Sequence, residues 1–234
     1  MARTDGPTVL IAGASRGLGL ALVTEFAKRD WSVIGTVRGT AHTPLHDLAE
    51  RLPSAVRIVS LDITKGTEIE ALRTRFAKER IDFLFVNAGT TTTDPLAEIG
   101  AVSDQEFERV MRTNALGPMR VIEAFQDLVP SDGMIGAMTS GQGSIANNER
   151  GQREVYRASK AALNMLVKSF AARQTNSERS IVVLAPGWIQ TDLGGEQAPF
   201  TVDETVPAMV DVLLAKRLRP GIEYLDRFGA TVPW

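Results

Sequence analysis

The chain has 234 residues and a formal net charge of −2, from 26 Lys and Arg against 28 Asp and Glu. This balance argues against a nucleic-acid-binding protein or one held to an anionic membrane surface, because both need a basic patch. There is no Cys and there are two His, His42 and His46, so disulfides and zinc sites are disfavoured and we expect no metal.

Short apolar segments alternate with longer helical patterns along the chain. The segments expected to form strands are Thr8–Ala12, Ser32–Val37, Val56–Asp62, Asp82–Gly89, Gly133–Ser140 and Ser180–Gly187. The expected helices are Gly17–Arg29, one opened by a capping box at Thr67 and Glu70, one from the capping box Ser103 and Glu106 to about Val129, and Glu154–Ala172. Residues 44–53 are expected to form a surface excursion.

Continuous apolar strands that alternate with helices are typical of a parallel sheet covered on both faces. We therefore predict an α/β fold, a doubly wound Rossmann fold with a mainly parallel sheet and helices on both faces, in a single domain over residues 1–234. The apolar run Val9–Ala14 is too short for a membrane span or a secretion signal. We expect a cytoplasmic protein with no membrane and no nucleic-acid partner.

A glycine-rich turn, "AGASRGLG", follows the first strand and places Gly13, Gly17 and Gly19 at the start of the first helix. Glycine permits positive φ angles and a close approach of the backbone to a ligand. A helix N-terminus offers free N–H groups and a partial positive charge to a phosphate. No G-K-[ST] follows, which excludes a P-loop. The place of the turn favours dinucleotide binding over a purely structural role.

The second strand ends in "GTVRG", which bears on the choice of cofactor. In dinucleotide-binding folds an acidic residue at this place binds the ribose 2′-hydroxyl, whereas an arginine accommodates a 2′-phosphate. Arg38 occupies the place and Arg16 lies in the glycine turn, so the two predict NADP(H) in preference to NAD(H). The alternative is two solvated arginines. Asp62, which ends the third strand, either holds the adenine edge or caps a turn.

The stretch "EVYRASK" places Tyr156 and Lys160 on one face of a helix, about 6 Å apart along its axis. A phenol has a pKa of about 10, and a nearby ammonium lowers it toward the range useful for proton exchange. Ser140, at the end of a strand, is placed to donate to a carbonyl or alkoxide oxygen. Asn114 lies in an expected helix, where Asn is unfavourable, so it indicates a tertiary role. A Tyr–Lys pair alone is more often a solvated surface.

Together with "NAG" and "PGWIQTD", these motifs resemble the classical short-chain dehydrogenases/reductases over essentially the whole chain. The segments "YRASKAALNM", "APGWIQTDLGG" and "GATVPW" are similar to the C-factor-like branch, which includes sniffer-type carbonyl reductases. The resemblance implies an NADPH-dependent carbonyl reductase-like enzyme with Asn114, Ser140, Tyr156 and Lys160 as catalytic residues and Tyr156 as the acid/base. It implies cofactor contacts at Gly13, Ser15, Arg16, Gly17, Leu18, Gly19, Arg38, Asp62, Ile63, Asn87, Ala88, Gly89, Tyr156, Lys160, Pro186, Gly187, Ile189 and Thr191.

Three features leave alternatives open. Ser144 is a rival to Ser140, which we prefer because it ends the strand and begins "SGQG". Ala12 stands where many family members have Thr, so a hydroxyl that supports the turn is missing. The charged residues 147–154 either are solvated or face the substrate.

The substrate and the assembly are less closely defined. Residues of about 188–205 are expected to form a substrate loop. Its part Leu193–Phe200 is short and has few charges, which favours a small or planar apolar carbonyl compound. The alternative function is a catalytically weak NADP(H)-sensing or signalling protein of the same fold. Too few residues follow Gly187 for the sugar-binding domain of an epimerase. The resemblance implies a homodimer or homotetramer through the Asn114 and Tyr156 helices; alternatively, Ala162–Phe170 packs only on the sheet.

Overall fold

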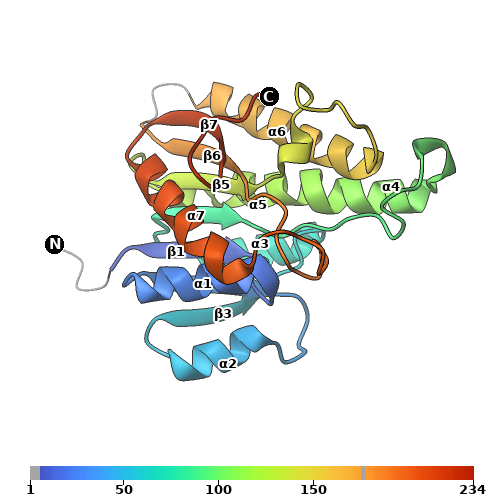
Figure 1. Ribbon diagram of the computed structural model, residues 1–234. Coiled ribbons are helices and arrows are strands. Elements are labelled where there is room, and N and C mark those ends of the chain that lie inside the picture. The colour runs from blue at the N-terminus through green and yellow to red at the C-terminus, as the bar shows by residue number, and fades with distance from the viewer. Residues whose placement is uncertain (1–5, 175–177) are drawn as a thin grey trace.

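The computed structural model describes residues 6–174 and 178–234; residues 1–5 and 175–177 of the expected domain lie outside this part. One seven-stranded sheet forms the centre of the molecule, in the order β3-β2-β1-β4-β5-β6-β7 (Figure 1). Its strands are β1 (Thr8–Ala12), β2 (Ser32–Val37), β3 (Val56–Ser60), β4 (Phe83–Val86), β5 (Met134–Met138), β6 (Ser180–Ala185) and β7 (Gly221–Asp226). Every neighbouring pair of strands is parallel.

Helices cover both faces of the sheet because successive strand residues point to opposite sides. Val9 and Ile11 of β1 pack with α1 (Gly17–Lys28), α2 (Pro44–Arg51) and α7 (Val202–Arg217). Leu10 and Ala12 pack on the other side with α3 (Gly66–Arg75), α5 (Gly117–Phe125) and α6 (Glu154–Arg173). The predicted doubly wound Rossmann fold is confirmed.

The strand order reverses between β1 and β4, whose neighbours β2 and β5 lead away in opposite directions. In open α/β sheets, ligands bind at such a switch point, at the carboxyl ends of the strands. The segments that follow β1 and β4, which carry the glycine turn and the "NAG" motif, therefore meet at the expected binding edge.

Two helices differ from their predicted starts and ends. Lys65 is the N-cap of α3, so the Thr67–Glu70 capping box does not form. The Ser103 hydroxyl does cap α4 (Asp104–Met111), but the long helix expected up to Val129 is interrupted. A π-helical turn, Arg112–Leu116, separates α4 from α5, and a 3-10 turn, Gln126–Leu128, follows α5.

Three elements were not predicted. The expected surface excursion at residues 44–53 contains α2, whose Leu45 and Leu48 are buried. The C-terminal part adds α7, opened by a complete capping box of Thr201 and Glu204, and the edge strand β7. Among the residues that the structure describes, no helix is both long enough and apolar enough to cross a membrane.

Candidate active site

The glycine turn has the backbone conformation that the sequence predicts. Gly13 and Gly17 have φ angles of +88° and +55°, in the region that favours glycine. A Cβ on Gly19 would lie 2.0 Å from the Gly13 carbonyl oxygen, so the first turn of α1 packs against the loop too closely for a side chain. Within the described residues, no side chain caps the N-terminus of α1, which leaves its N–H groups for a ligand.

A hydroxyl from β2 supports this turn in place of the one missing at Ala12. The Thr36 Oγ1 accepts a hydrogen bond of 2.9 Å from the Gly13 N–H. On the other side, the Asn87 amide donates to the Gly13 carbonyl at 2.7 Å. Asn87 therefore links the "NAG" motif after β4 to the glycine turn. The role of Thr36 was not predicted from the sequence, because it depends on how β2 pairs with β1 in the sheet.

The glycine turn forms one wall of a pocket at the carboxyl ends of the first strands. Its lining residues are Gly13, Ser15, Thr36, Arg38, Leu61, Ile63 and Ala88. Arg38 is exposed at the rim. The carboxylate of Asp62 accepts from the Thr64 N–H and hydroxyl, at 2.9 and 2.7 Å, and so caps a turn, one of its two predicted roles. Burial acts to raise the pKa of Asp62, but these bonds and the Arg38 charge lower it overall.

Arg16 lies at the same end of the sheet but contacts a different group. Its guanidinium is 2.7 Å from the Asp192 carboxylate, and both side chains are about two-thirds exposed, at 68% and 71%. Such a surface ion pair contributes little stability, about 0–1 kcal/mol, so Arg16 can leave Asp192 at little cost in free energy. The pairing of Arg16 with Arg38 around a phosphate stays a prediction.

The predicted substrate loop runs from the end of β6 to Thr201. Gly187 has a φ angle of +91°, and the Pro186 carbonyl accepts from Arg227 at 3.5 Å. Ile189 is buried and forms a bridge with Phe200. The loop is shorter than predicted, because residues 202–205 belong to α7.

Trp188 contacts the substrate loop itself, and Thr191 lies beside the glycine turn. Trp188 is 52% exposed and donates to the Gly194 carbonyl at 2.7 Å. The Thr191 methyl would lie 3.7 Å from a Cβ on Gly17. The loop therefore lies beside the N-terminus of α1, as the cofactor assignment of Thr191 requires. Leu18, the residue after Gly17, is half-buried.

Asn114 is buried inside the π-helical turn, a distortion that is frequent at functional sites. Its Oδ1 accepts from the Thr90 N–H at 2.7 Å, and its Nδ2 donates to the Thr90 carbonyl at 2.8 Å and to Ser159 Oγ at 2.9 Å. A Cβ on Gly89 would lie 3.4 Å from both Asn114 Oδ1 and Lys160 Nζ. Asn114, Gly89 and Lys160 therefore lie together.

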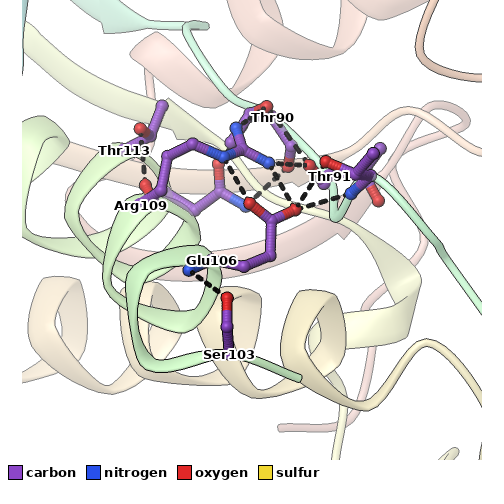
Figure 2. A network of polar contacts seen from close by, with 8 residues as sticks. Thr90, Thr91, Ser103, Glu106, Arg109 and Thr113 are labelled. Atoms are coloured by element: carbon purple, nitrogen blue, oxygen red, sulfur yellow. Dashed lines mark hydrogen bonds and ion pairs between the residues drawn. The ribbon is translucent and has the colours of Figure 1, made fainter. Parts of the chain in front are cut away.

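Figure 2 shows a network that holds the segment bound by Asn114. Arg109 donates to the Thr90 hydroxyl at 2.9 Å and to the Thr91 carbonyl at 2.6 Å. Glu106 accepts from Arg109 at 2.7 Å and from the Thr93 N–H at 2.6 Å. The bond with Arg109 lowers the pKa of Glu106 to about 2. This charged support was not predicted, because Arg109 and Thr90 belong to different elements.

The two candidate serines have different surroundings. Ser140 is half-buried, and its Oγ accepts from the Gln142 N–H at 3.1 Å. Its carbonyl accepts from the Tyr224 hydroxyl at 2.5 Å, so β7 also holds this residue. Ser144 is buried, and its Oγ caps a turn by accepting from the Asn147 N–H at 3.2 Å. This contrast favours Ser140 as the serine of the site.

Tyr156 and Lys160 lie in the first turns of α6 and are 7% and 3% exposed. The Lys160 ammonium lies 5.9 Å from the Tyr156 ring centroid and donates to the Met138 carbonyl at 2.9 Å. Burial lowers the pKa of Lys160 to about 8.

The lowering of the Tyr156 pKa by Lys160 stays a prediction. Burial raises this pKa, whereas a hydrogen bond with Ser140 and the charge of Arg153 act to lower it. Arg153, to which the sequence analysis gave no role, is therefore a further cation that favours the phenolate.

The doubly wound sheet and its glycine turn define a Rossmann-type protein, and comparison with known proteins gives its family. A family model described as short chain dehydrogenase matches residues 7–200. The chain belongs to this family of oxidoreductases.

Three relatives refine the comparison. A Burkholderia multivorans structure, described as a short-chain dehydrogenase/reductase with bound NADP, is 57% identical over 97% of this chain and 99% of that chain, with a TM-score of 0.96. C-signal of Myxococcus xanthus is 33% identical over 71% of this chain and 100% of its own length. The carbonyl reductase Sniffer of D. melanogaster is 28% identical over 97% of this chain and 99% of that chain, with a TM-score of 0.89. The predicted resemblance is confirmed.

Proposed function

We propose that this oxidoreductase binds NADP(H) and interconverts a small carbonyl compound and its alcohol, with Tyr156 as the acid/base. The observation that carries the proposal is the grouping of a buried phenol, the Ser140 hydroxyl and the Lys160 ammonium at the edge of the sheet where the glycine turn lies. NADP bound to the 57% identical Burkholderia multivorans protein supports the choice of cofactor.

The residues around the pocket fit a dinucleotide with a 2′-phosphate. The uncapped N–H groups of α1 suit a pyrophosphate, and the exposed Arg38 guanidinium suits a second phosphate at the rim. NADPH, when bound, supplies the hydride for reduction of the carbonyl carbon.

The chain supplies the proton and the orientation of the substrate oxygen. In reduction, the Tyr156 hydroxyl donates its proton to the oxygen of the carbonyl group, while the Ser140 hydroxyl donates a hydrogen bond to the same oxygen. Lys160 holds a positive charge beside the tyrosine that the transfer leaves deprotonated. Asn114 fixes the segment after Gly89 and so keeps the Lys160 end of the site in place.

The experiment is NADPH consumption over a panel of small aldehydes, ketones and quinones. We expect Tyr156→Phe to reduce kcat by at least about 100-fold, since general acid catalysis contributes about 10²–10⁴-fold. Ser144→Ala is the matched control, and its kcat should stay within about threefold of wild type. Equal turnover by wild type and Tyr156→Phe would overturn the assignment.

A second candidate is a protein that binds NADP(H) and turns substrate over weakly, as a sensor or signal. The similarity to C-signal is the observation that favours it. Saturable NADPH binding without turnover of any panel member would support this candidate over the reductase.

A further inference from the structure

The turn that leads into α6 has an unusual backbone. Gly151, Gln152 and Arg153 have consecutive φ angles of +61°, +58° and +53°. Only glycine adopts this left-handed region without cost, so two of the three residues are strained. Strain of this kind persists where the surrounding structure holds it, and it is frequent at functional sites. The turn lies directly before α6, whose third residue is Tyr156.

The strained turn places the Arg153 side chain on Tyr156. The guanidinium carbon lies 4.9 Å from the centroid of the Tyr156 ring. Its Nη2 donates a hydrogen bond of 3.2 Å to the Thr91 hydroxyl. Its Nε is buried and has no hydrogen-bond partner among the described residues. The neighbouring carboxylate of Glu154 accepts from the Ile99 N–H instead.

Few other charged groups face the phenol. Lys160 of α6 lies 5.9 Å from the ring centroid, and burial lowers the pKa of its ammonium to about 8. Tyr224 of β7 is also close, but burial raises its pKa to about 12, so it is neutral. Arg109, which donates to the Thr91 carbonyl, forms an ion pair with Glu106, so these two charges neutralise each other (Figure 2). Ser140, after β5, is uncharged.

These contacts give Arg153 a position that packing and hydrogen bonding explain poorly. A buried donor without a partner and a left-handed backbone both oppose the observed arrangement. A permanent positive charge over a phenol that must become a phenolate would favour that arrangement in a catalytic site.

We propose that Arg153 is a positioning residue that fixes the Tyr156 ring and stabilises its deprotonated form, as a second cation beside Lys160. The inference rests on the proposed function for its catalytic meaning. The opposing effects of burial and of the Arg153 charge on the pKa of Tyr156 agree with it.

The chain contains two tyrosines, so the phenol can be titrated directly. The tyrosinate absorbance of a protein minus that of its Tyr156→Phe form reports Tyr156 alone, with no substrate or cofactor. We expect Arg153→Gln to raise the midpoint by about one pH unit, the lower end of the effect of a nearby charge. Arg153→Lys should restore most of the wild-type midpoint. Arg150→Gln, which removes an exposed arginine of the same segment, should leave it unchanged.

An identical midpoint in wild type and Arg153→Gln would overturn the inference. If Arg153→Gln does not fold, Arg153→Asn keeps a residue that tolerates the left-handed turn and removes the same charge. The pH profile of carbonyl reduction is the second readout. Its alkaline limb should move up with the midpoint. A shifted midpoint with full turnover by Tyr156→Phe would remove the proposed function alone, whereas an unshifted midpoint with inactive Tyr156→Phe would remove this inference alone.

Discussion

Lys160 carries an ammonium group into a buried site, where it contacts one backbone carbonyl. Burial disfavours the charged form and lowers its pKa from 10.5 to about 8. The unfolded chain therefore binds more protons than the folded chain between about pH 8 and pH 10.5. The free energy of unfolding should rise with pH through this window, because the cost of the buried charge disappears.

Replacement of Lys160 by an apolar side chain should remove the free-energy cost of burying its charge. We expect Lys160→Met to increase the free energy of unfolding at pH 7 by about 1–3 kcal/mol, because the cost of the buried charge exceeds the value of the lost hydrogen bond. The gain should shrink toward zero by about pH 10.5. Urea unfolding at both pH values measures it, with Lys28→Met, an exposed lysine, as the control. A gain that is independent of pH would contradict the argument.

At the scale of elements, the helices and strands that were predicted correctly are those whose residues carry a local sequence pattern. The six earlier strands, the glycine turn and the helix that carries Tyr156 follow from apolar runs, turn residues and caps. Helix α2 was missed because Leu45 and Leu48 are few apolar residues in a polar segment. The support of Gly13 by Thr36, and of Ser140 by Tyr224, depends on the order of the strands in the sheet. Such contacts have no local signal.

The end of β2 carries the prediction on cofactor choice. Arg38 lines the pocket, whereas Arg16 contacts Asp192, so Arg38 should contribute more to binding a 2′-phosphate. We expect Arg38→Gln to weaken NADP binding by about tenfold or more, the value of a charge-assisted hydrogen bond of at least about 1.5 kcal/mol. NAD binding should not change.

Calorimetric titration of both nucleotides measures this discrimination. Arg57→Gln, on the exposed side of β3, is the matched control and should bind NADP as wild type does. Wild-type protein that binds NAD as tightly as NADP would contradict the role given to Arg38. Arg16→Gln, which removes an arginine outside the pocket lining, should weaken NADP binding less than Arg38→Gln does.

At the scale of the whole molecule, helices α4 and α6 each expose large apolar side chains among their polar residues. Met165 and Leu166 of α6 are 63% and 40% exposed, and Phe107 of α4 is 39% exposed. Leu163, Val167 and Phe170 of the same α6 stretch pack on the sheet. The alternative in which this stretch packs only on the sheet is therefore wrong for Met165 and Leu166. These exposed apolar residues are candidates for an interface with another protein surface.

The family resemblance implies a homodimer or a homotetramer, and of these we expect a dimer in which this surface pairs two copies of the chain. A dimer with twofold symmetry would bring the same α4 and α6 residues of both copies together. Light scattering after size exclusion should give twice the mass of the chain, 25.4 kDa, for wild type. Met165→Glu with Leu166→Glu should give the monomer mass, because two buried charges per copy are not compensated. Leu218→Glu, at an 83% exposed position after α7, is the control and should stay dimeric. A monomeric wild type at micromolar concentration would contradict the prediction and leave the apolar surface to a different partner.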